Sequence, residues 1–233
     1  MLSPLRMPLC RTTGMSIPFL ITGPDDASVT VLLAHGAGGA MDAPAMTRSA
    51  DALAAVGLRV ARFEFGYMAE RRRSERRPPP PRAETLVPEY LAAVRAIWGG
   101  ALVIGGKSMG GRIASMVADD LHRSGAIAGL LCLGYPFHPI GKPEQLRTAH
   151  LERLQTPTLI CQGTRDAFGT REEVSGYALS DHVDISWLED GDHDLKPRKA
   201  ISGFSAADHM ATMAGRVKLW TDDLLSRKVL GNR

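Results

Sequence analysis

The chain of 233 residues carries 28 lysines and arginines against 25 acidic residues, which leaves a formal net charge of +3. Its 44% hydrophobic and 23% charged residues are typical of a globular protein that can bury a sizeable core. The weak charge does not indicate a nucleic-acid partner, and no apolar run has the length of a membrane span. The three cysteines have neither metal-binding nor disulfide-framework spacing, which favours a reducing, cytoplasmic environment.

The first 15 residues contain no continuous apolar segment of the kind found in secretory signals. We therefore interpret residues 1–15 as a loose leader and residues 16–233 as a single domain.

Apolar runs that indicate strands alternate with stretches of helical spacing along the domain. We expect strands over residues 16–22, 29–34, 58–65, 101–104, 126–133, 157–162 and 183–188. Helices are expected over residues 44–56 and 83–98, after residue 108, and over about 205–225, whereas residues 66–82 break the pattern. This alternation predicts an α/β fold, with a mostly parallel twisted sheet of about six to eight strands and helices on both faces.

A G-x-S-x-G motif, Gly106 to Gly110, separates a predicted strand from a predicted helix. In such a strand-to-helix turn the serine adopts strained backbone geometry, and a Cβ on either flanking glycine would collide with neighbouring backbone. Ser108 is therefore a candidate nucleophile, and the N–H of Met109 is a candidate oxyanion donor. The alternative is a purely structural glycine-rich turn.

Serine needs a base and an orienting acid, and both can come from loops at the carboxyl ends of later strands. Asp166 follows the strand predicted to end at residue 162, and His193 follows the strand predicted to end at residue 188. The order Ser108, Asp166, His193 is the one expected of an α/β-hydrolase. Asp166 could instead cap a helix beginning near Thr170, and His193 could lie in a solvated turn.

The loop from His35 to Gly39 follows the predicted central strand. The N–H of Ala37 is expected to be the second oxyanion donor, and His35 to anchor the loop rather than act as a base. The alternative of phosphate binding is disfavoured because neither G-x-G-x-x-G nor a P-loop lysine pattern is present. We expect His122, His150 and His182 at the surface.

These motifs resemble the α/β-hydrolase superfamily over about residues 16–225. The segments HGAGG at residue 35, FEFGYM at 63, GGKSMGGR at 105, GTRD at 163 and GDHD at 191 are similar to a narrower group. That group includes testis-expressed protein 30 and the chromatin-complex subunit called NSL complex subunit 3. The resemblance implies the α/β-hydrolase fold and supports the Ser108, Asp166 and His193 triad, but it does not indicate the substrate.

The expected function is hydrolysis of a small ester or thioester through an acyl-enzyme, with no metal or organic cofactor. The alternatives are a peptidase or amidase using the same residues, and a non-catalytic binding or scaffold module on the same fold. Only the short segment 135–154 is a candidate cap, so we expect an open site. Aromatic side chains are expected to line it beside Met109: Phe65, Tyr67, Tyr135, Phe137 and Phe168.

An arginine-rich stretch from Glu70 to Arg77 precedes four prolines. It is interpreted as a solvated excursion stiffened by polyproline. The alternative is that Arg72 or Arg76 binds an anionic group of the acyl substrate.

Overall fold

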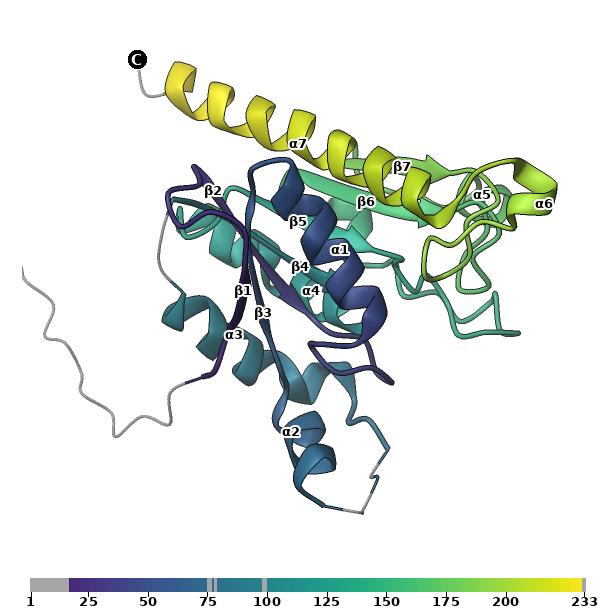
Figure 1. The fold of residues 1–233 in the computed structure, drawn as a ribbon, viewed down its shortest axis with the longest axis horizontal. Helices are drawn as coiled ribbons and strands as arrows, with labels where there is room; N and C mark the ends of the chain where they lie inside the picture. The colour runs from purple at the N-terminus through teal and green to yellow at the C-terminus, as the bar shows by residue number, and fades with distance from the viewer. Residues whose placement is uncertain (1–16, 75–76, 78, 98–99, 232–233) are drawn as a thin grey trace, which may run out of the picture.

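The computed structural model describes residues 17–74, 77, 79–97 and 100–231, so the predicted leader lies outside the described residues. A seven-stranded sheet with strand order β1-β3-β2-β4-β5-β6-β7 runs through the molecule (Figure 1). Its strands are β1 (Leu20–Thr22), β2 (Val29–Ala34), β3 (Arg59–Phe63), β4 (Ala101–Lys107), β5 (Gly129–Leu133), β6 (Thr158–Gly163) and β7 (Val183–Leu188). Only the edge strand β1 is antiparallel to its neighbour, which confirms the predicted mostly parallel sheet.

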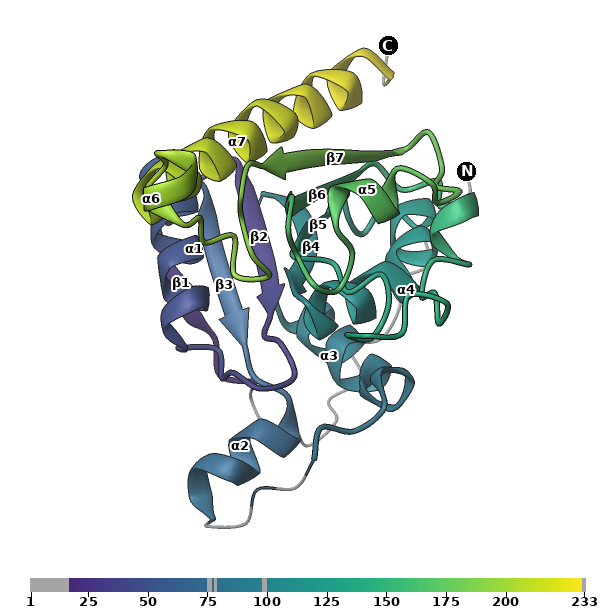
Figure 2. The ribbon, with the colours of Figure 1, turned by 90° about the vertical axis from the view of Figure 1, so that its right-hand side faces the viewer.

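Helices cover both faces of the sheet (Figures 1 and 2). They are α1 (Pro44–Ala55), α2 (Gly66–Arg73), α3 (Val87–Ala96), α4 (Met109–Arg123), α5 (Arg171–Val174), α6 (Lys199–Ser202) and α7 (Ala206–Gly231), with 3-10 turns η1 (Ala83–Leu86) and η2 (Leu151–Arg153). In the part of the chain that the structure describes, no helix combines the length and apolarity needed to cross a membrane.

Two hydrophobic cores, one on each face, follow from the alternation of side chains along buried strands. In β2, Val31 and Leu33 belong to the core under α1 and α7, whereas Leu32 packs into the core under α3 and α4. Both faces of β2 are thus buried, which explains why its sequence is a continuous apolar run rather than an alternating one.

The segment 66–82 differs from the prediction, because its first part forms the helix α2, which projects from one end of the molecule (Figure 2). Only Tyr67 and Met68 of this helix are buried, so the sequence shows no apolar stripe of helical period. Arginines at 71–73 occupy its last turn, where cations interact favourably with the helix dipole.

The strand order reverses at β2, because β3 lies on one side of it and β4 on the other. Ala34 at the end of β2 is in register with Gly106 near the end of β4. The loops after β2 and β4 therefore meet at one edge of the sheet, where open α/β sheets bind their ligands.

His35 anchors the glycine-rich loop after β2 from inside the protein, as predicted. The fully buried imidazole accepts a hydrogen bond from the Phe65 N–H at Nε2 (3.1 Å) and donates from Nδ1 to the Gly36 carbonyl (2.7 Å). The Tyr67 hydroxyl donates to the carbonyl of Ala37 (3.1 Å). Burial lowers the pKa of His35, which keeps the ring neutral as this bonding pattern requires.

Tyr90 ties α3 to the middle of β4. Its buried hydroxyl donates to the Gly105 carbonyl (2.8 Å) and accepts from the Gly105 N–H (2.9 Å). By contrast, the hydroxyl of Tyr177 makes no hydrogen bond within the described residues.

Replacing Tyr90 by phenylalanine is expected to lower the free energy of unfolding by about 1–3 kcal/mol, because it removes both bonds to buried backbone groups. Tyr177→Phe is the matched control and should cost nothing measurable. Urea denaturation of both variants tests this, and equal losses would contradict the assignment.

The free energy of unfolding is expected to fall as the pH drops below about 6.5. The His35 imidazole takes up a proton in the unfolded chain at that pH, whereas burial opposes its protonation in the folded protein. The pKa of His150 is also lowered by burial and acts in the same direction. His35→Gln can still accept the Phe65 N–H bond but cannot titrate, so its unfolding free energy should depend less on pH. Denaturation at pH 8 and pH 5.5 measures the difference; an unchanged pH dependence would show that His35 does not cause it.

Candidate active site

Ser108 occupies the sharp turn between β4 and α4 that the sequence predicted. Its φ of 51° and ψ of −118° lie outside the regions that a non-glycine residue normally adopts. The surrounding backbone fixes this conformation, since the Ser108 N–H donates to the Leu133 carbonyl and the Ser108 carbonyl accepts from the Arg112 N–H. The hydroxyl is thereby carried on a rigid support at the edge of the sheet.

The glycines on either side of Ser108 are required by close backbone contacts, as expected from the motif. A Cβ on Gly106 would lie 2.6 Å from the Ala34 carbonyl oxygen, and one on Gly110 would lie 2.4 Å from the same atom. Real Cβ atoms do not approach backbone this closely. The motif therefore packs α4 directly against the end of β2.

His193 and Asp166 are joined by a hydrogen bond in which Nδ1 donates to Oδ2 over 2.8 Å. The loops that carry them are in backbone contact, because a Cβ on Gly163 would lie 2.2 Å from the Gly191 carbonyl oxygen. Asp166 is not a helix cap, since Thr170 caps α5 through a capping box with Glu173.

The carboxylate of Asp166 is fully buried and is bound only by neutral donors besides His193. Gln162 Nε2 donates to Oδ2 (2.9 Å), and the Phe168 N–H donates to Oδ1 (2.9 Å). Gln162 is itself buried, and its Oε1 accepts from the Tyr135 N–H (2.7 Å). These bonds satisfy the carboxylate and fix its orientation toward the imidazole.

Lys107 holds the His193 loop against the serine turn. Its Nζ donates to the His193 carbonyl (2.8 Å) and pairs with Asp194 Oδ1 (2.8 Å). Although partial burial raises the pKa of Asp194, the Lys107 hydrogen bond and charge bring that pKa below its usual value. At the other end of the loop, a hydrogen bond from Arg198 lowers the pKa of Asp190 to about 2.

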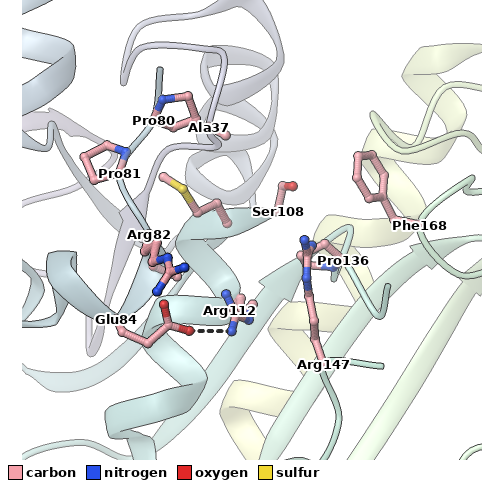
Figure 3. A pocket seen from close by; sticks show the side chains of 12 residues that line it. Ala37, Pro80, Pro81, Arg82, Glu84, Ser108, Arg112, Pro136, Arg147 and Phe168 are labelled. Atoms are coloured by element: carbon pink, nitrogen blue, oxygen red, sulfur yellow. Dashed lines mark hydrogen bonds and ion pairs between the residues drawn. The ribbon is translucent and has the colours of Figure 1, made fainter. Parts of the chain in front are cut away.

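Two cavities meet at Ser108. The first, which we call the arginine cavity, has a volume of about 640 Å³ and is drawn in Figure 3. It is lined by Ala37, Pro80, Pro81, Arg82, Ala83, Glu84, Ser108, Met109, Arg112, Pro136, Arg147 and Phe168. The second, the histidine cavity, has a volume of about 510 Å³, and His193, Lys107, Met46 and the loop 36–39 line it together with Ser108 and Phe168.

Ser108 and His193 thus face the same cavity, although the described residues form no hydrogen bond between them. Catalytic hydrogen bonds are often longer in ligand-free proteins and tighten when substrate binds. The Phe168 ring packs over the imidazole with the ring centroids 4.3 Å apart. Among the described residues, no group of three or more histidines, cysteines or acidic residues is arranged to hold a metal ion.

Met109 and Ala37, the residues whose N–H groups were expected to bind an oxyanion, both line the arginine cavity beside Ser108. Met109 begins α4, and the first N–H groups of a helix have no acceptor within the helix. Ala37 lines both cavities from the loop after β2. Within the described residues, neither N–H donates a hydrogen bond.

The expectation that five aromatic residues line the site is wrong for four of them, and only Phe168 lines the cavities. Tyr135 and Phe137 are fully buried with their ring centroids 5.0 Å apart, and Pro136, in the tight turn between them, lines the cavity instead. Phe65 and Tyr67 are also buried, and they pack against the His35 ring below the loop.

Arg72 lines neither of the two cavities at Ser108, which disfavours the alternative in which it binds an anionic group of the substrate. It pairs with Asp42 and with Glu64 (2.8 Å), and both carboxylates raise its pKa. Arg76 lies outside the described residues. His150 is not a free surface residue either, because its Nε2 lies 2.7 Å from the buried Ser115 hydroxyl.

Sequence reasoning missed the roles of Gln162, Arg112 and Arg147 near the site. Gln162 is a polar residue near the end of the otherwise apolar strand β6, just before the loop that carries Asp166. Its position there was the signal that could have indicated a contact with Asp166. Arg112 stands within the GGKSMGGR segment. Arg147 lies in a segment without periodicity, which gave no signal.

Comparison with known structures shows the same fold in several hydrolases. A serine hydrolase homologue from Coxiella burnetii is 24% identical, with a TM-score of 0.59 over 75% of this chain and 82% of that one. An esterase domain from Rhodothermus marinus is 17% identical, with a TM-score of 0.59 over 88% and 98% of the two chains. Est1E from Butyrivibrio proteoclasticus is 12% identical, with a TM-score of 0.65 over 91% and 98%.

A family model described as the alpha/beta hydrolase domain matches residues 27–222, which include the serine turn and the loops of Asp166 and His193. On this match and on its seven-stranded sheet, the chain belongs to the α/β-hydrolase family.

Proposed function

We propose that this protein is a serine hydrolase that cleaves a small ester or thioester through an acyl-enzyme. The observation that carries the proposal is the position of Ser108, which stands in a strained turn and faces one cavity with an imidazole bound to a buried carboxylate. The fold shared with esterases agrees with it. The similarity to the narrower group of testis-expressed protein 30 stays a prediction.

In the neutral imidazole of His193, the hydrogen bond to Asp166 places the single N–H on Nδ1, so that Nε2 can accept a proton. As the Ser108 oxygen attacks the carbonyl carbon, Nε2 takes the hydroxyl proton and the carbonyl oxygen becomes negative. The imidazolium then gives this proton to the leaving alcohol or thiol, and the acyl group remains on Ser108. Water then gives a proton to the same nitrogen as it attacks the acyl carbon; the bond from that carbon to Ser108 Oγ breaks, the imidazolium returns the proton to Oγ, and the acid is released.

The negative oxygen of the tetrahedral intermediate is stabilised by the N–H groups of Met109 and Ala37. Each such donor contributes about 3–4 kcal/mol to transition-state stabilisation in a studied serine hydrolase. Pre-arranged donors are effective because they need no reorganisation as the charge develops. The anchoring of the Ala37 loop by His35 and Tyr67 supplies that rigidity here.

Two other functions share part of this arrangement. A peptidase or amidase would use the same residues but must protonate a poorer leaving group, so a panel of matched esters and amides separates the two activities. A scaffold module would need no buried Asp166 bound to His193, which favours an enzyme. The absence of a helical cap over segment 134–157, which holds only η2, favours small or extended acyl substrates.

A fluorophosphonate probe is expected to label the wild-type protein covalently, because it reacts with an activated serine hydroxyl. Ser108→Ala should abolish labelling, and Ser115→Ala is the control, since that hydroxyl, although it lies beside His150, is buried and lines neither cavity. Labelling is read by intact mass. A folded wild-type protein that stays unlabelled, or a labelled Ser108→Ala variant, would refute the proposal.

Asp166→Asn is expected to lower kcat for an activated ester by about 100- to 10,000-fold, because the amide can donate to Nδ1 and favour the unproductive tautomer of His193. Asp192→Asn is the matched control in the histidine loop, where the carboxylate accepts from the backbone N–H groups of Asp194 and Lys196 and pairs with Arg165 (3.6 Å) rather than with His193. Steady-state kinetics decide: a comparable loss in both variants would point to loop disruption instead of a triad.

A further inference from the structure

The arginine cavity carries an excess of positive charge beside the reactive serine. Three arginines line it, and Glu84 is the only acidic residue among its described lining residues. Glu84 pairs with Arg112 over 2.8 Å. In the view of Figure 3, the Glu84 carboxylate lies between Arg82 and Arg112, and the Arg147 side chain extends toward Pro136 on the other side. The single carboxylate of Glu84 therefore neutralises only part of the positive charge of the three arginines that line this cavity.

The backbone of Arg147 is held firmly although it lies outside regular structure. Its N–H donates to the Phe137 carbonyl (2.7 Å), and its carbonyl accepts from the Tyr135 hydroxyl (3.0 Å). Both aromatic residues are fully buried. The Tyr135 hydroxyl and the Phe137 backbone carbonyl thus hold the Arg147 backbone beside the cavity.

Arg147 has no ionic partner within the part of the chain that the structure describes, since its side chain makes neither an ion pair nor a hydrogen bond there. Partial burial, together with the charge of Arg112, lowers the pKa of Arg147. Arg112 keeps a donor free as well, because its buried Nε has no partner among the described residues. A partly desolvated pair of guanidinium groups without sufficient counter-charge is stabilised by an anion that binds both.

The position of His193 decides which part of a substrate reaches these arginines. His193 must protonate the leaving group, and it lines the other cavity. The leaving alcohol or thiol therefore extends into the histidine cavity. The acyl chain, on the opposite side of the carbonyl carbon, extends past Met109 into the arginine cavity.

We propose that Arg147 and Arg112 form a subsite for an anionic group on the acyl chain, so that the preferred substrates are half-esters or half-thioesters of dicarboxylic acids. This inference rests on the proposed serine hydrolase function. The arginines act on specificity by binding the distal carboxylate, and they take no part in bond making.

The test compares two activated esters that share a leaving group: the 4-nitrophenyl monoester of adipic acid and its neutral methyl ester. The wild-type protein should have the higher kcat/KM for the acidic ester, and added salt should reduce that preference. Arg147→Met should lower kcat/KM for the acidic ester about tenfold more than for the neutral one, as loss of charge-assisted hydrogen bonds implies. Glu84→Gln removes the competing carboxylate and should increase the preference.

Arg123→Met is the control, because Arg123 lies on α4, the helix of Arg112, but is exposed and among the described residues pairs with Asp120 alone. Arg123→Met should leave the ratio of kcat/KM for the acidic ester to kcat/KM for the neutral ester unchanged. A wild-type protein without preference, or an Arg147→Met variant that loses both activities equally, would overturn the subsite while leaving the proposed hydrolase intact.

A binding measurement separates the subsite from the hydrolase function. Calorimetry with adipate on the Ser108→Ala variant needs no turnover, and Arg147→Met in that background should weaken binding about tenfold. Adipate binding that depends on Arg147 would support the subsite, and if the wild-type protein hydrolysed neither ester, the proposed activity alone would be refuted. Equal binding with and without Arg147 would overturn the subsite.

Discussion

The close approach of α4 to the end of β2 is the constraint on which this site depends. Two glycines remove the side chains that would otherwise keep the helix away from the Ala34 carbonyl, and the serine between them is left in a strained backbone conformation. The strained conformation is held by the pairing of β4 on both sides up to this turn and by the two backbone hydrogen bonds of Ser108. The same contact sets the distance between the serine turn and the loop of Ala37, which is held from below by His35.

The polar groups around the serine are arranged in layers of decreasing exposure. Ser108 and His193 face a cavity, Asp166 is fully buried behind the imidazole, and Gln162 fixes the carboxylate from within the sheet. Each buried polar atom in this chain of contacts has its partner, as low dielectric surroundings demand. An arrangement of this kind restrains the imidazole to one tautomer, which is what proton transfer from a hydroxyl requires.

Much of this architecture could be predicted from the sequence, because strands and their ends leave local signals. Continuous apolar runs marked the strands, and the loops that follow them carried Ser108, Asp166 and His193, which the fold brings to one edge of the sheet. The helix α2 was not predicted, since its polar sequence has no apolar period. The aromatic lining was misjudged at Tyr135 and Phe137, because which residue of a tight turn faces a cavity depends on packing that the local sequence does not reveal.

The arginines also show that the local sequence does not reveal which side chains reach the cavities at Ser108. The dense run near residue 72 was conspicuous in the sequence, yet Arg72 is neutralised by Asp42 and Glu64 away from the cavities. Arg147 is isolated in the sequence but reaches the cavity because the buried Tyr135 and Phe137 hold its backbone. Tertiary contacts, rather than local charge density, decide which cations are available to a ligand.

The central claim is that Ser108 is a nucleophile whose carbonyl substrate is bound between two backbone N–H groups. A crystal structure of the protein after reaction with an alkyl fluorophosphonate tests it most directly. The account predicts phosphorus bonded to Ser108 Oγ and the phosphoryl oxygen within about 2.7–3.1 Å of the N–H groups of Ala37 and Met109. A phosphonate attached to another residue, or a phosphoryl oxygen turned away from both N–H groups, would contradict it.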